Sequence, residues 1–428
     1  MSRRLIVTAV LAVSALISMP AIAKDDLLDT LAQKGILTPE EYDKLKAQQK
    51  SEVVVDTSEG FKIVSIDNAN SFQVGTLLQL DWSQYKDDKS DLANGTELRR
   101  SRISTSGVVL KDWAYRFEYE FSGTAGVTDA YVAYTAFKPV LITVGQFKQP
   151  ISMEALASDK NLTFMERGLP FAFIPARAAG AMVGTSGYNW SFNGGVFGEP
   201  VGNASSGDEG FGLASRVSFA PILSDGKLIH LGLGAAWRKP TSNNSADKLS
   251  SALAFSSKPE SDVTATKFVN TSEIKNVHQY AIETLELAGQ LGAASVQGEY
   301  TATQVKREVG QKLNFSGWYA QLAYTLTGEK RPYKADKGVF DGIRPNKNFG
   351  RDGWGAFEVA ARVSGIDLTD NTVKGGKERN AAFTFNWYLN PFMRMSANVV
   401  KVLKVEDGAP ASNGDEPTVF QIRAQLAL

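Results

Sequence analysis

Residues 357–364 read Phe-Glu-Val-Ala-Ala-Arg-Val-Ser, and this stretch shows the pattern from which the fold can be inferred. Apolar side chains stand at the odd positions, while Glu358, Arg362 and Ser364 stand at even ones. Successive side chains of a β-strand point to opposite faces of the sheet, so a strand here has one apolar and one charged face. The same period of two recurs from residue 71 onward, in segments such as 72–82, 115–122, 211–219, 229–238, 318–326 and 420–428.

These segments are too long and too polar on one face for a soluble β-sandwich. Sandwich strands average about five or six residues, whereas about ten residues cross a bilayer when the strand is tilted. Arg, Glu, Gln and Ser on the second face suit a wet interior. Aromatic residues stand near the expected strand ends, as at membrane interfaces: Trp82, Tyr85, Trp113, Tyr115, Trp237, Trp387 and Tyr388. The pattern predicts an all-β protein, a transmembrane antiparallel β-barrel whose closure leaves no strand edge unpaired.

The expected barrel covers residues 71–428. With roughly 22 residues per strand and connection, this length gives about sixteen strands, with about fourteen or eighteen as alternatives. We expect strands to start near residues 71, 98, 114, 128, 140, 179, 189, 211, 228, 279, 293, 315, 356, 380, 393 and 418. The long polar segments 87–96, 239–276 and 406–417 are expected to be extracellular loops. A barrel of this size leaves an aqueous channel.

The N-terminal residues have the form of a secretory signal peptide over residues 1–23. A short basic start precedes an apolar stretch too short to span a bilayer, and Ala21-Ile-Ala23 is a small-residue cleavage site. Residues 24–70 are expected to form a periplasmic helical, coiled-coil segment and linker. Within it, Thr38 and Glu41 predict a helix start, because they form a capping box. We therefore expect an exported protein of a Gram-negative outer membrane.

Composition excludes several classes of protein. The chain has 428 residues, no Cys, and two His, His230 and His278, that lie far apart in the sequence. Disulfides, thiolate metal sites and a Cys nucleophile are therefore excluded. The balance of 46 basic and 46 acidic residues argues against a nucleic-acid binder, and a mean hydropathy of −0.18 against a helical membrane protein. We expect no enzyme activity, cofactor, metal or nucleic-acid partner, and read Glu118 and Glu120 as part of an ion-pair network.

Residues 148–177 break the strand pattern. The segment is rich in Pro and Phe, has no period of two, and carries apolar residues that an exposed loop would not, such as Phe164, Leu169 and Phe173. We expect a loop that folds into the barrel and narrows the pore. Its charged residues would then lie at the constriction: Lys148, Glu154, Lys160, Glu166, Arg167 and Arg177. Arg and Lys side chains at such a place favour anions.

Several sequence blocks occur in a fixed order: Glu97-Leu-Arg-Arg-Ser-Arg-Ile103, Lys111-Asp-Trp-Ala-Tyr115, Asp129-Ala-Tyr-Val132, Val144-Gly-Gln-Phe-Lys-Gln-Pro150, Phe164-Met-Glu-Arg-Gly-Leu-Pro170, Trp318-Tyr-Ala-Gln-Leu-Ala-Tyr-Thr-Leu-Thr-Gly-Glu329 and Phe385-Asn-Trp-Tyr388. In order and spacing they resemble the phosphate-selective porins (O/P type) of Gram-negative outer membranes, over nearly all of the chain after the signal peptide. The resemblance implies a sixteen-stranded homotrimeric porin, surrounded by outer-membrane lipid and lipopolysaccharide, that passes phosphate or other small anions by diffusion.

The resemblance also implies which residues contact the solute. Arg99 and Arg100 stand where the family has a double Arg, and Arg100 shares a strand face with Arg102. Lys148 and Arg167 match cations of the family's constriction loop. The full set of expected ligand-binding residues is Arg100, Arg102, Asp129, Lys148, Glu166 and Arg167. A structural hydrogen bond at Asp129 and an ion pair between Glu166 and Arg167 are the alternative interpretations.

Two departures from the family bear on specificity. Leu77 stands where phosphate-specific members carry Arg, and residues 239–306 contain no Arg, although those members have several in this long loop. We therefore expect an anion preference without strict phosphate specificity. The alternatives are a less selective general porin, a non-conducting structural or adhesin barrel, and a lipase barrel, which would need a Ser–His pair.

Overall fold

The computed structural model describes residues 31–32, 34–48, 53–57, 60–175, 177–202, 208–242, 251–408 and 412–428. The predicted signal peptide, residues 1–23, lies outside the described residues. The chain forms two compact units, Met1–Val54 and Val55–Leu428. The second unit contains all of the large sheet from β2 onward.

The first unit contains α3 (Pro39–Gln48), which begins where the sequence predicts a helix start. The backbone N–H of Glu41 donates to Thr38 Oγ1 at 3.2 Å, and the N–H of Thr38 donates to Glu41 Oε2 at 2.9 Å. These reciprocal bonds satisfy two N–H groups that have no partner within the helix, which is the function of a capping box. Across the described ranges, no helix has the length and apolarity needed to cross a membrane.

Sixteen long strands in the described residues form the barrel. They are β3 (Ser71–Lys86), β4 (Gly95–Val109), β5 (Trp113–Glu120), β6 (Gly126–Tyr134), β7 (Val140–Phe147), β8 (Ala178–Ser186), β9 (Trp190–Phe197), β10 (Phe211–Ser224), β11 (Lys227–Lys239), β16 (Val277–Leu291), β17 (Ala294–Arg307), β18 (Leu313–Thr325), β21 (Ala356–Asp370), β22 (Val373–Tyr388), β23 (Met393–Glu406) and β24 (Thr418–Ala427). Short β1 (Val53–Asp56) and β2 (Phe61–Ser65) precede them.

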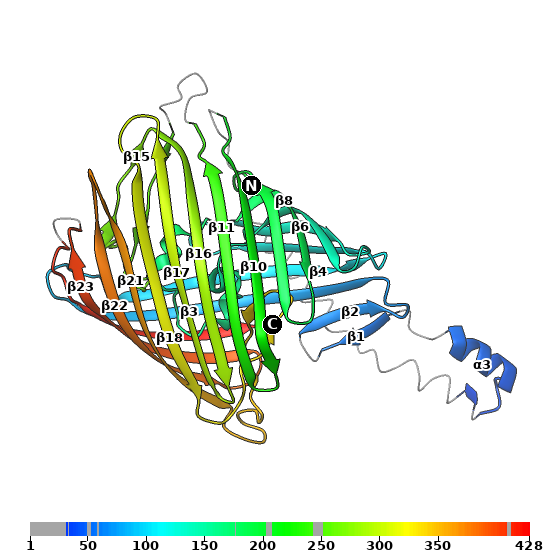
Figure 1. Cartoon of the computed structure of the whole chain (residues 1–428). Coiled ribbons are helices and arrows are strands. Elements are labelled where there is room, and N and C mark those ends of the chain that lie inside the picture. The colour runs from blue at the N-terminus through cyan, green and yellow to red at the C-terminus, as the bar shows by residue number, and fades with distance from the viewer. Residues whose placement is uncertain are drawn as a thin grey trace, which may run out of the picture. The chain divides into compact units, whose positions relative to one another are not determined.

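The barrel is closed and antiparallel (Figure 1). Each strand pairs with its neighbours in the sequence order of the long strands, and β24 returns to pair with β3, for example at Ile422 and Trp82. The predicted count of sixteen strands is confirmed, and most predicted starts lie within three residues of the observed ones. The largest difference is at β22, which begins at Val373 and not near residue 380. Its first residues, 374–379, are charged or Gly and therefore hide the apolar alternation.

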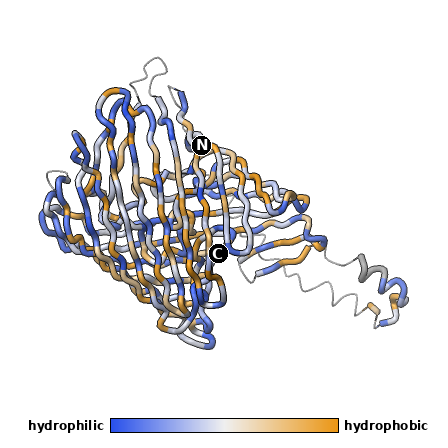
Figure 2. Tube along the Cα trace, in the orientation of Figure 1, coloured by the Kyte–Doolittle hydropathy of each residue, from blue (hydrophilic) through white to orange (hydrophobic). Residues whose placement is uncertain are grey.

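The alternation places apolar side chains outside and polar ones inside. The colours of Figure 2 alternate along the strands as this requires. Leu322 and Phe383 are 58% and 51% exposed on the outer face, whereas inward-facing Arg362 and Arg423 are almost fully buried. Two aromatic residues differ from the prediction of an interfacial girdle. Tyr85 and Tyr388 point inward, where Tyr85 shares a hydrogen bond with Ser261 and Tyr388 donates to Glu358.

The barrel wall has uneven height. Strands β5–β9 have eight or nine residues each, whereas the other barrel strands have ten to sixteen. The five short strands are consecutive neighbours in the sheet. We call this part, β5–β9, the short wall.

Three long connections enter the barrel. The constriction segment, residues 148–177, contains α4 (Met153–Leu156), η2 (Asp159–Asn161) and η3 (Leu169–Phe173). The inner loop, residues 251–276, contains the short strands β12 (Ala252–Leu253), β13 (Ser256–Ser257), β14 (Val269–Asn270) and β15 (Ile274–Lys275). The inner turn, residues 326–355, contains β19 (Tyr333–Lys334) and β20 (Val339–Phe340).

The sequence predicts the inward course of the constriction segment but not that of the other two connections. In the inner loop, Phe255 and Phe268 are buried with residues of the constriction segment and the wall, although the sequence indicates only a long polar loop. The constriction segment and inner loop enter from the loop end of the barrel, where β3 finishes and β4 begins. The inner turn enters from the opposite termini end, where β3 begins and β24 finishes.

A cation-lined cavity as the candidate functional site

A cavity of about 530 Å³ lies inside the barrel between the constriction segment and the inner turn. Side chains of β3–β6 form one side of it, and the turn at residues 390–393 lies at its termini end. Nine basic side chains line the cavity: Arg102, Arg116, Lys148, Lys160, Arg177, Lys334, Lys337, Arg344 and Arg394. Four acidic side chains also line it: Glu118, Asp129, Asp159 and Asp341. The lining therefore has a surplus of positive charge, although the whole chain has none.

Glu166 fixes the constriction segment to the barrel wall. Its carboxylate accepts hydrogen bonds from Arg99 Nε at 2.9 Å and Arg99 Nη2 at 3.0 Å, and from Arg423 Nη2 at 2.8 Å. Arg423 also binds Asp81 through two bonds of 2.7 and 2.6 Å. Bidentate pairs of this kind are short and directional. They hold the segment against β3, β4 and β24 at a mostly buried place.

A β-bulge brings both members of the double Arg to the same face. Gln79 pairs with Arg100 and the next residue, Leu80, pairs with Leu98, so Arg99 is the extra residue in β4. Strict alternation would place Arg99 outside, but the bulge turns it inward to Glu166. Sequence parity alone could not indicate this, because a bulge shifts the side-chain pattern by one residue.

Asp159 is the second anchor of the constriction segment. Its carboxylate lies 2.5 Å from Arg102 Nη1, 2.7 Å from Arg167 Nη1 and 3.6 Å from Arg100 Nε. Three of the predicted solute-binding cations therefore converge on one carboxylate that the sequence did not single out. Burial favours the neutral acid, but the charges of Arg167 and Arg100 outweigh it and hold the pKa of Asp159 well below its usual value.

The inner loop and the inner turn are attached by the same chemistry. Arg362 of β21 donates to Glu260 of the inner loop at 2.7 Å and to the backbone oxygen of Glu166 at 3.0 Å. It thereby joins two of the inward connections. On the termini side, Arg216 of β10 donates to the backbone oxygens of Lys337 and Gly338, at 2.8 and 2.7 Å. These bonds position the inner turn under the cavity.

Lys160 is the most open cation on the constriction segment. It is exposed toward the cavity, and no ion pair among the described residues includes its ammonium group. Desolvation in the barrel interior and the charges of Lys334, Arg116 and Arg344 lower the pKa of Lys160, while Asp341 acts in the opposite direction. A group surrounded by like charges and lacking a fixed counter-ion attracts a mobile anion. Lys160 therefore marks the part of the cavity best suited to contact a solute.

The cations on β5 and at the start of β8 are partly neutralised. Arg116 lies 2.6 Å from Glu118 and 3.4 Å from Asp129, and Arg177 lies 2.6 Å from Asp129. Their side chains are 32% and 20% exposed, so both also meet the cavity. The Glu118 carboxylate thus belongs to an ion-pair network, as the sequence indicated.

Lys148 lies at the start of the constriction segment, outside the strands. Its ammonium group donates to the backbone oxygens of Ala155 and Ala157, at 2.7 and 2.9 Å. Burial lowers the pKa of Lys148 to about 7, with Asp159 opposing the shift and Arg167 adding to it. Unlike the neighbouring guanidinium groups, this cation can lose its charge near neutral pH.

The structure places the predicted solute-binding residues in two groups. Arg100 and Arg167 face inward but are 4% and 7% exposed, because the constriction segment covers or contains them. Glu166, 14% exposed, acts as an anchor of the same segment. Arg102, Asp129 and Lys148 line the cavity itself. The alternative interpretation, an ion pair between Glu166 and Arg167, is wrong, because Arg167 pairs with Asp159.

The predicted solute-binding set omitted several residues that line the cavity: Arg116, Asp159, Lys160, Arg177, Lys334, Lys337 and Arg344. The sequence could have indicated the omitted residues of segment 326–355, because Lys and Arg outnumber Asp and Glu there. This segment lies between two strong strand patterns and is too long for a tight turn. Among the described residues, no three His, Asp or Glu side chains gather as a metal site.

A closed sixteen-stranded barrel with an apolar outside, an inward-folded loop and a charged wet cavity defines a porin, a channel of the outer membrane. The sequence profile of the phosphate-selective porin O and P family matches residues 72–428, and the chain belongs to this family.

Comparisons with individual proteins support this family assignment. The chain is 28% identical to Porin O of Pseudomonas aeruginosa over 401 residues, which cover 86% of this chain and 90% of that protein. It is 30% identical to an uncharacterized protein of Caulobacter vibrioides over 363 residues, 81% of this chain and 71% of that one.

Among solved structures, OmpT of Vibrio cholerae matches with a TM-score of 0.54 and 13% identity, covering 88% of this chain and all of that one. An anion-selective porin from Comamonas acidovorans matches with a TM-score of 0.51 and 13% identity, covering 84% and 100%. At such identities the solved structures show the shared fold alone.

Proposed function

We propose that the protein lets phosphate and other small anions diffuse through the outer membrane by way of the cation-lined cavity. The observation that carries the proposal is the lining itself, with nine basic against four acidic side chains. An anion entering a narrow pore loses hydration, and charge-assisted contacts with Lys and Arg replace it. Membership of the phosphate-selective family and the similarity to Porin O support the same solute class.

The accessible cations favour a general anion preference over strict phosphate specificity. Many lumen Arg side chains already hold carboxylates, such as Arg362 with Glu260 and Arg216 with Glu286. In the inner loop, Lys258 pairs with Asp262 at 2.9 Å. These pairs leave fewer cations without a carboxylate partner. Among the described residues, Lys160 is the clearest example of such an unpaired cation. A weak site releases its ion readily, as conduction requires.

The two imidazoles have structural contacts. His230 is fully buried between Tyr333 Oη at 2.7 Å and Glu286 Oε2 at 3.2 Å, and it therefore serves as a wall residue. His278 is exposed and lies 2.5 Å from Glu308. In the described part of the chain both are thus bonded to Tyr or Glu, so a lipase-type barrel, which needs a Ser–His pair, has no support. We propose a channel without enzymatic activity.

We also propose an orientation, with the loop end outside the cell and residues 24–70 in the periplasm. Barrels of this class have short periplasmic turns and longer extracellular loops. The turns at residues 110–112, 187–189 and 225–226 are short and lie at the termini end, with the start of β3. The inner turn is then a long periplasmic connection, and the cavity is the last part of the pore before the periplasm.

The short wall supports a homotrimer. A strand of eight residues, tilted by about 45°, covers about 19 Å of height, less than the apolar band of about 25 Å. Its outer face is apolar, with Val144 and Val183 51% and 46% exposed. A second copy covers such a face better than lipid does, and closed rotational symmetry leaves no copy with an open side. The longer strands would face lipid and lipopolysaccharide.

Ion selectivity in planar bilayers tests the proposed function. With a potassium chloride gradient, we expect a reversal potential whose sign shows preference for chloride. Replacing chloride by phosphate should keep a measurable anion current. Preference for potassium would contradict the proposal. Complete absence of conductance in a folded, inserted protein would favour the structural or adhesin barrel, and equal passage of both ions would favour a general porin.

A further inference from the structure

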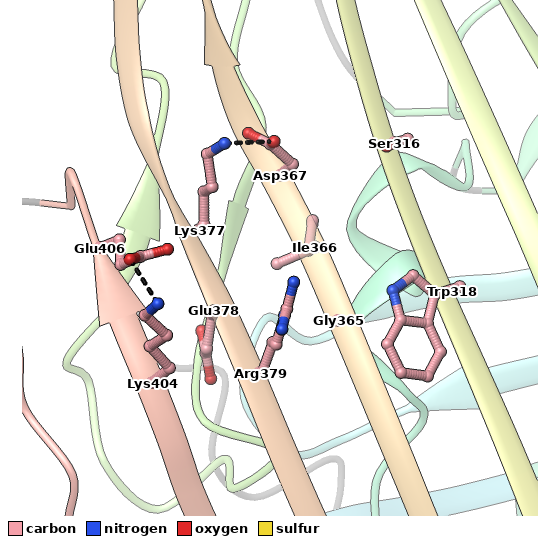
Figure 3. A pocket seen from close by; sticks show the side chains of 10 residues that line it. All are labelled: Ser316, Trp318, Gly365, Ile366, Asp367, Lys377, Glu378, Arg379, Lys404 and Glu406. Carbon is pink, nitrogen blue, oxygen red and sulfur yellow. Dashed lines mark ion pairs between the residues drawn. The ribbon is translucent and has the colours of Figure 1, made fainter.

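A hollow of about 270 Å³ lies on the outer surface of the barrel, and Figure 3 shows the side chains that line it. It crosses strands β18, β21, β22 and β23 toward the loop end. Trp318, which is 39% exposed, stands on the same outer face as Leu322. The hollow has no part in the channel, because its cationic side chains point away from the lumen.

The strand register builds the floor and sides of the hollow. Trp318 pairs with Gly365, Gly365 pairs with Arg379, and Arg379 pairs with Lys404, so these four residues form one row across four strands. Gly365 allows the Trp318 ring to lie close to the backbone of β21, since a Cβ there would lie 2.9 Å from the indole nitrogen. The Trp318 ring and the Arg379 guanidinium group therefore both line the hollow.

A second row of charged residues lies next to the first, toward the loop end. Asp367 pairs in register with Lys377, and Lys377 with Glu406. Lys377 Nζ lies 2.9 Å from Asp367 and Lys404 Nζ lies 2.5 Å from Glu406, as the dashed lines in Figure 3 mark. Arg379 belongs to no ion pair among the described residues and is exposed. The cluster thus holds two fixed lysines and one guanidinium with unused donors.

The position of the hollow fits a headgroup at a membrane boundary. On the same face, the apolar belt continues below it through Val363 and Phe383, which are 43% and 51% exposed. In the order of the barrel strands, β21 lies opposite β7, the middle of the short wall. A copy of the chain bound at the short wall would leave this side to lipid.

We propose that this hollow binds a phosphorylated glycolipid of the outer leaflet, with its phosphate on Arg379 and Lys404 and a sugar ring on Trp318. Guanidinium binds a phosphate through two parallel N–H groups, and the flat indole face accepts the apolar face of a sugar. The acyl chains would continue onto Val363 and Phe383. The carboxylates of Asp367 and Glu406 keep the lysines in place and accept hydrogen bonds from sugar hydroxyls. The proposal rests on the proposed orientation, in which the loop end is outside.

Native mass spectrometry of the full chain in detergent tests the proposal. The probes are diphosphoryl lipid A, the same glycolipid without phosphates, phosphatidylglycerol and inorganic phosphate. We expect a stable complex with diphosphoryl lipid A and weaker retention of the other two lipids. The double variant Arg379→Gln/Lys404→Gln should lower lipid A occupancy about tenfold, since each cation near a charged lipid contributes measurably to binding.

A matched control keeps the charge change constant. Lys239 and Lys306 are exposed cations at the loop end of β11 and β17, outside the Trp318 row. The variant Lys239→Gln/Lys306→Gln should retain lipid A like the wild type. Equal loss in both double variants would reduce the effect to general surface charge and overturn the proposal. So would equal retention of the phosphate-free glycolipid, or a shift caused by inorganic phosphate alone.

Conductance measurements test the proposed lipid site independently of the proposed channel function. The Arg379→Gln/Lys404→Gln variant should form channels with unchanged conductance and unchanged anion preference, because neither side chain faces the lumen. Unchanged conductance also shows that the variant is folded. If the wild type proves cation-selective but still retains lipid A through these residues, only the channel proposal fails.

Discussion

Lys160 and Asp159 are adjacent in the sequence but have opposite tasks. Asp159 is almost fully buried and forms ion pairs with three Arg side chains, while Lys160 is exposed toward the cavity and has no ion-pair partner among the described residues. The short 3-10 helix η2 turns consecutive side chains in different directions, one to the wall and one to the pore. A single step along the sequence therefore separates a charge that anchors the segment from a charge that faces the cavity.

Replacing Lys160 tests this division. Lys160→Glu should lower the permeability ratio of chloride to potassium several-fold, because a charge reversal of two units at an exposed pore position changes the local potential directly. Lys160→Gln should have about half of that effect on the reversal potential. The measurement is the reversal potential in planar bilayers, with Lys227→Glu, an exposed position at the termini end of β11, as the control. Unchanged selectivity in Lys160→Glu would remove Lys160 from the solute path.

The lowered pKa of Lys148 predicts that anion selectivity depends on pH. Its pKa is lowered to about 7, so the ammonium group is charged below that pH and neutral above it. Anion preference should therefore decrease as the pH rises from about 6 to about 8. The charges of Asp159, Arg167, Arg177 and Asp129 surround it, and Asp159 stays ionised in that window because its pKa is held well below the usual value. In Lys148→Met the selectivity should be the same at both pH values, and a persistent pH dependence would place its origin elsewhere.

At the level of elements, three connections change an open barrel into a narrow one. The constriction segment and inner loop come from one end and the inner turn from the other. Each is attached by Arg on the wall and carboxylates or backbone oxygens on the connection, for example Arg423 with Glu166 and Arg216 with Gly338. Wall arginines are rigid, multi-donor groups and suit this task better than Lys.

Glu166→Gln should loosen the constriction segment. The substitution leaves Arg99 and Arg423 without a shared counter-charge in a mostly buried place, and breaking such a pair costs about 3 kcal/mol. We expect faster trypsin cleavage after Arg167 in the folded, detergent-solubilised protein. Glu308→Gln, which removes the exposed partner of His278, should leave the cleavage rate unchanged. Equal protection of Arg167 in both variants would show that apolar packing alone holds the segment.

For the whole molecule, wall height determines which side meets lipid. The short wall is apolar yet too low for the membrane band, whereas the strands on the opposite side, around β21, have up to sixteen residues. In the proposed homotrimer, one side of each chain would meet the other copies and the opposite side would meet lipid. The charges of the outer face follow this division, since the hollow at Arg379 lies on the high side.

The absence of Cys allows a direct test of the trimer. Val144→Cys on the short wall should resist a lipid-soluble maleimide in the assembled protein and react after dissociation to monomers. Val363→Cys on β21, exposed to a similar extent, should react in both states. Labelling is read by mass spectrometry after size-exclusion chromatography. Equal labelling of both positions in the assembled protein would contradict an interface at the short wall.

The barrel, its number of strands and the face of most side chains can be predicted from the sequence. They follow from a period of two within each strand. Burial of the apolar face in lipid determines which side chains point outward. The place of Glu118 in an ion-pair network and the inward course of residues 148–177 follow from equally local patterns. The prediction for Tyr85 and Tyr388 was wrong, because an aromatic residue near a strand end suits both an interface and an interior hydrogen bond.

The charges that remain available to a solute depend on the tertiary structure. The pair of Arg423 and Asp81 joins residues 342 positions apart, and Arg99 meets Glu166 across 67 positions with the help of a bulge. Such pairs depend on barrel closure and on the path of loops through the lumen, neither of which leaves a periodic signal in the sequence. Arg100 is thus a buried anchor and Lys160 a pore cation. The physical reason is that Coulomb interactions act between neighbours in space, whatever their separation in the chain.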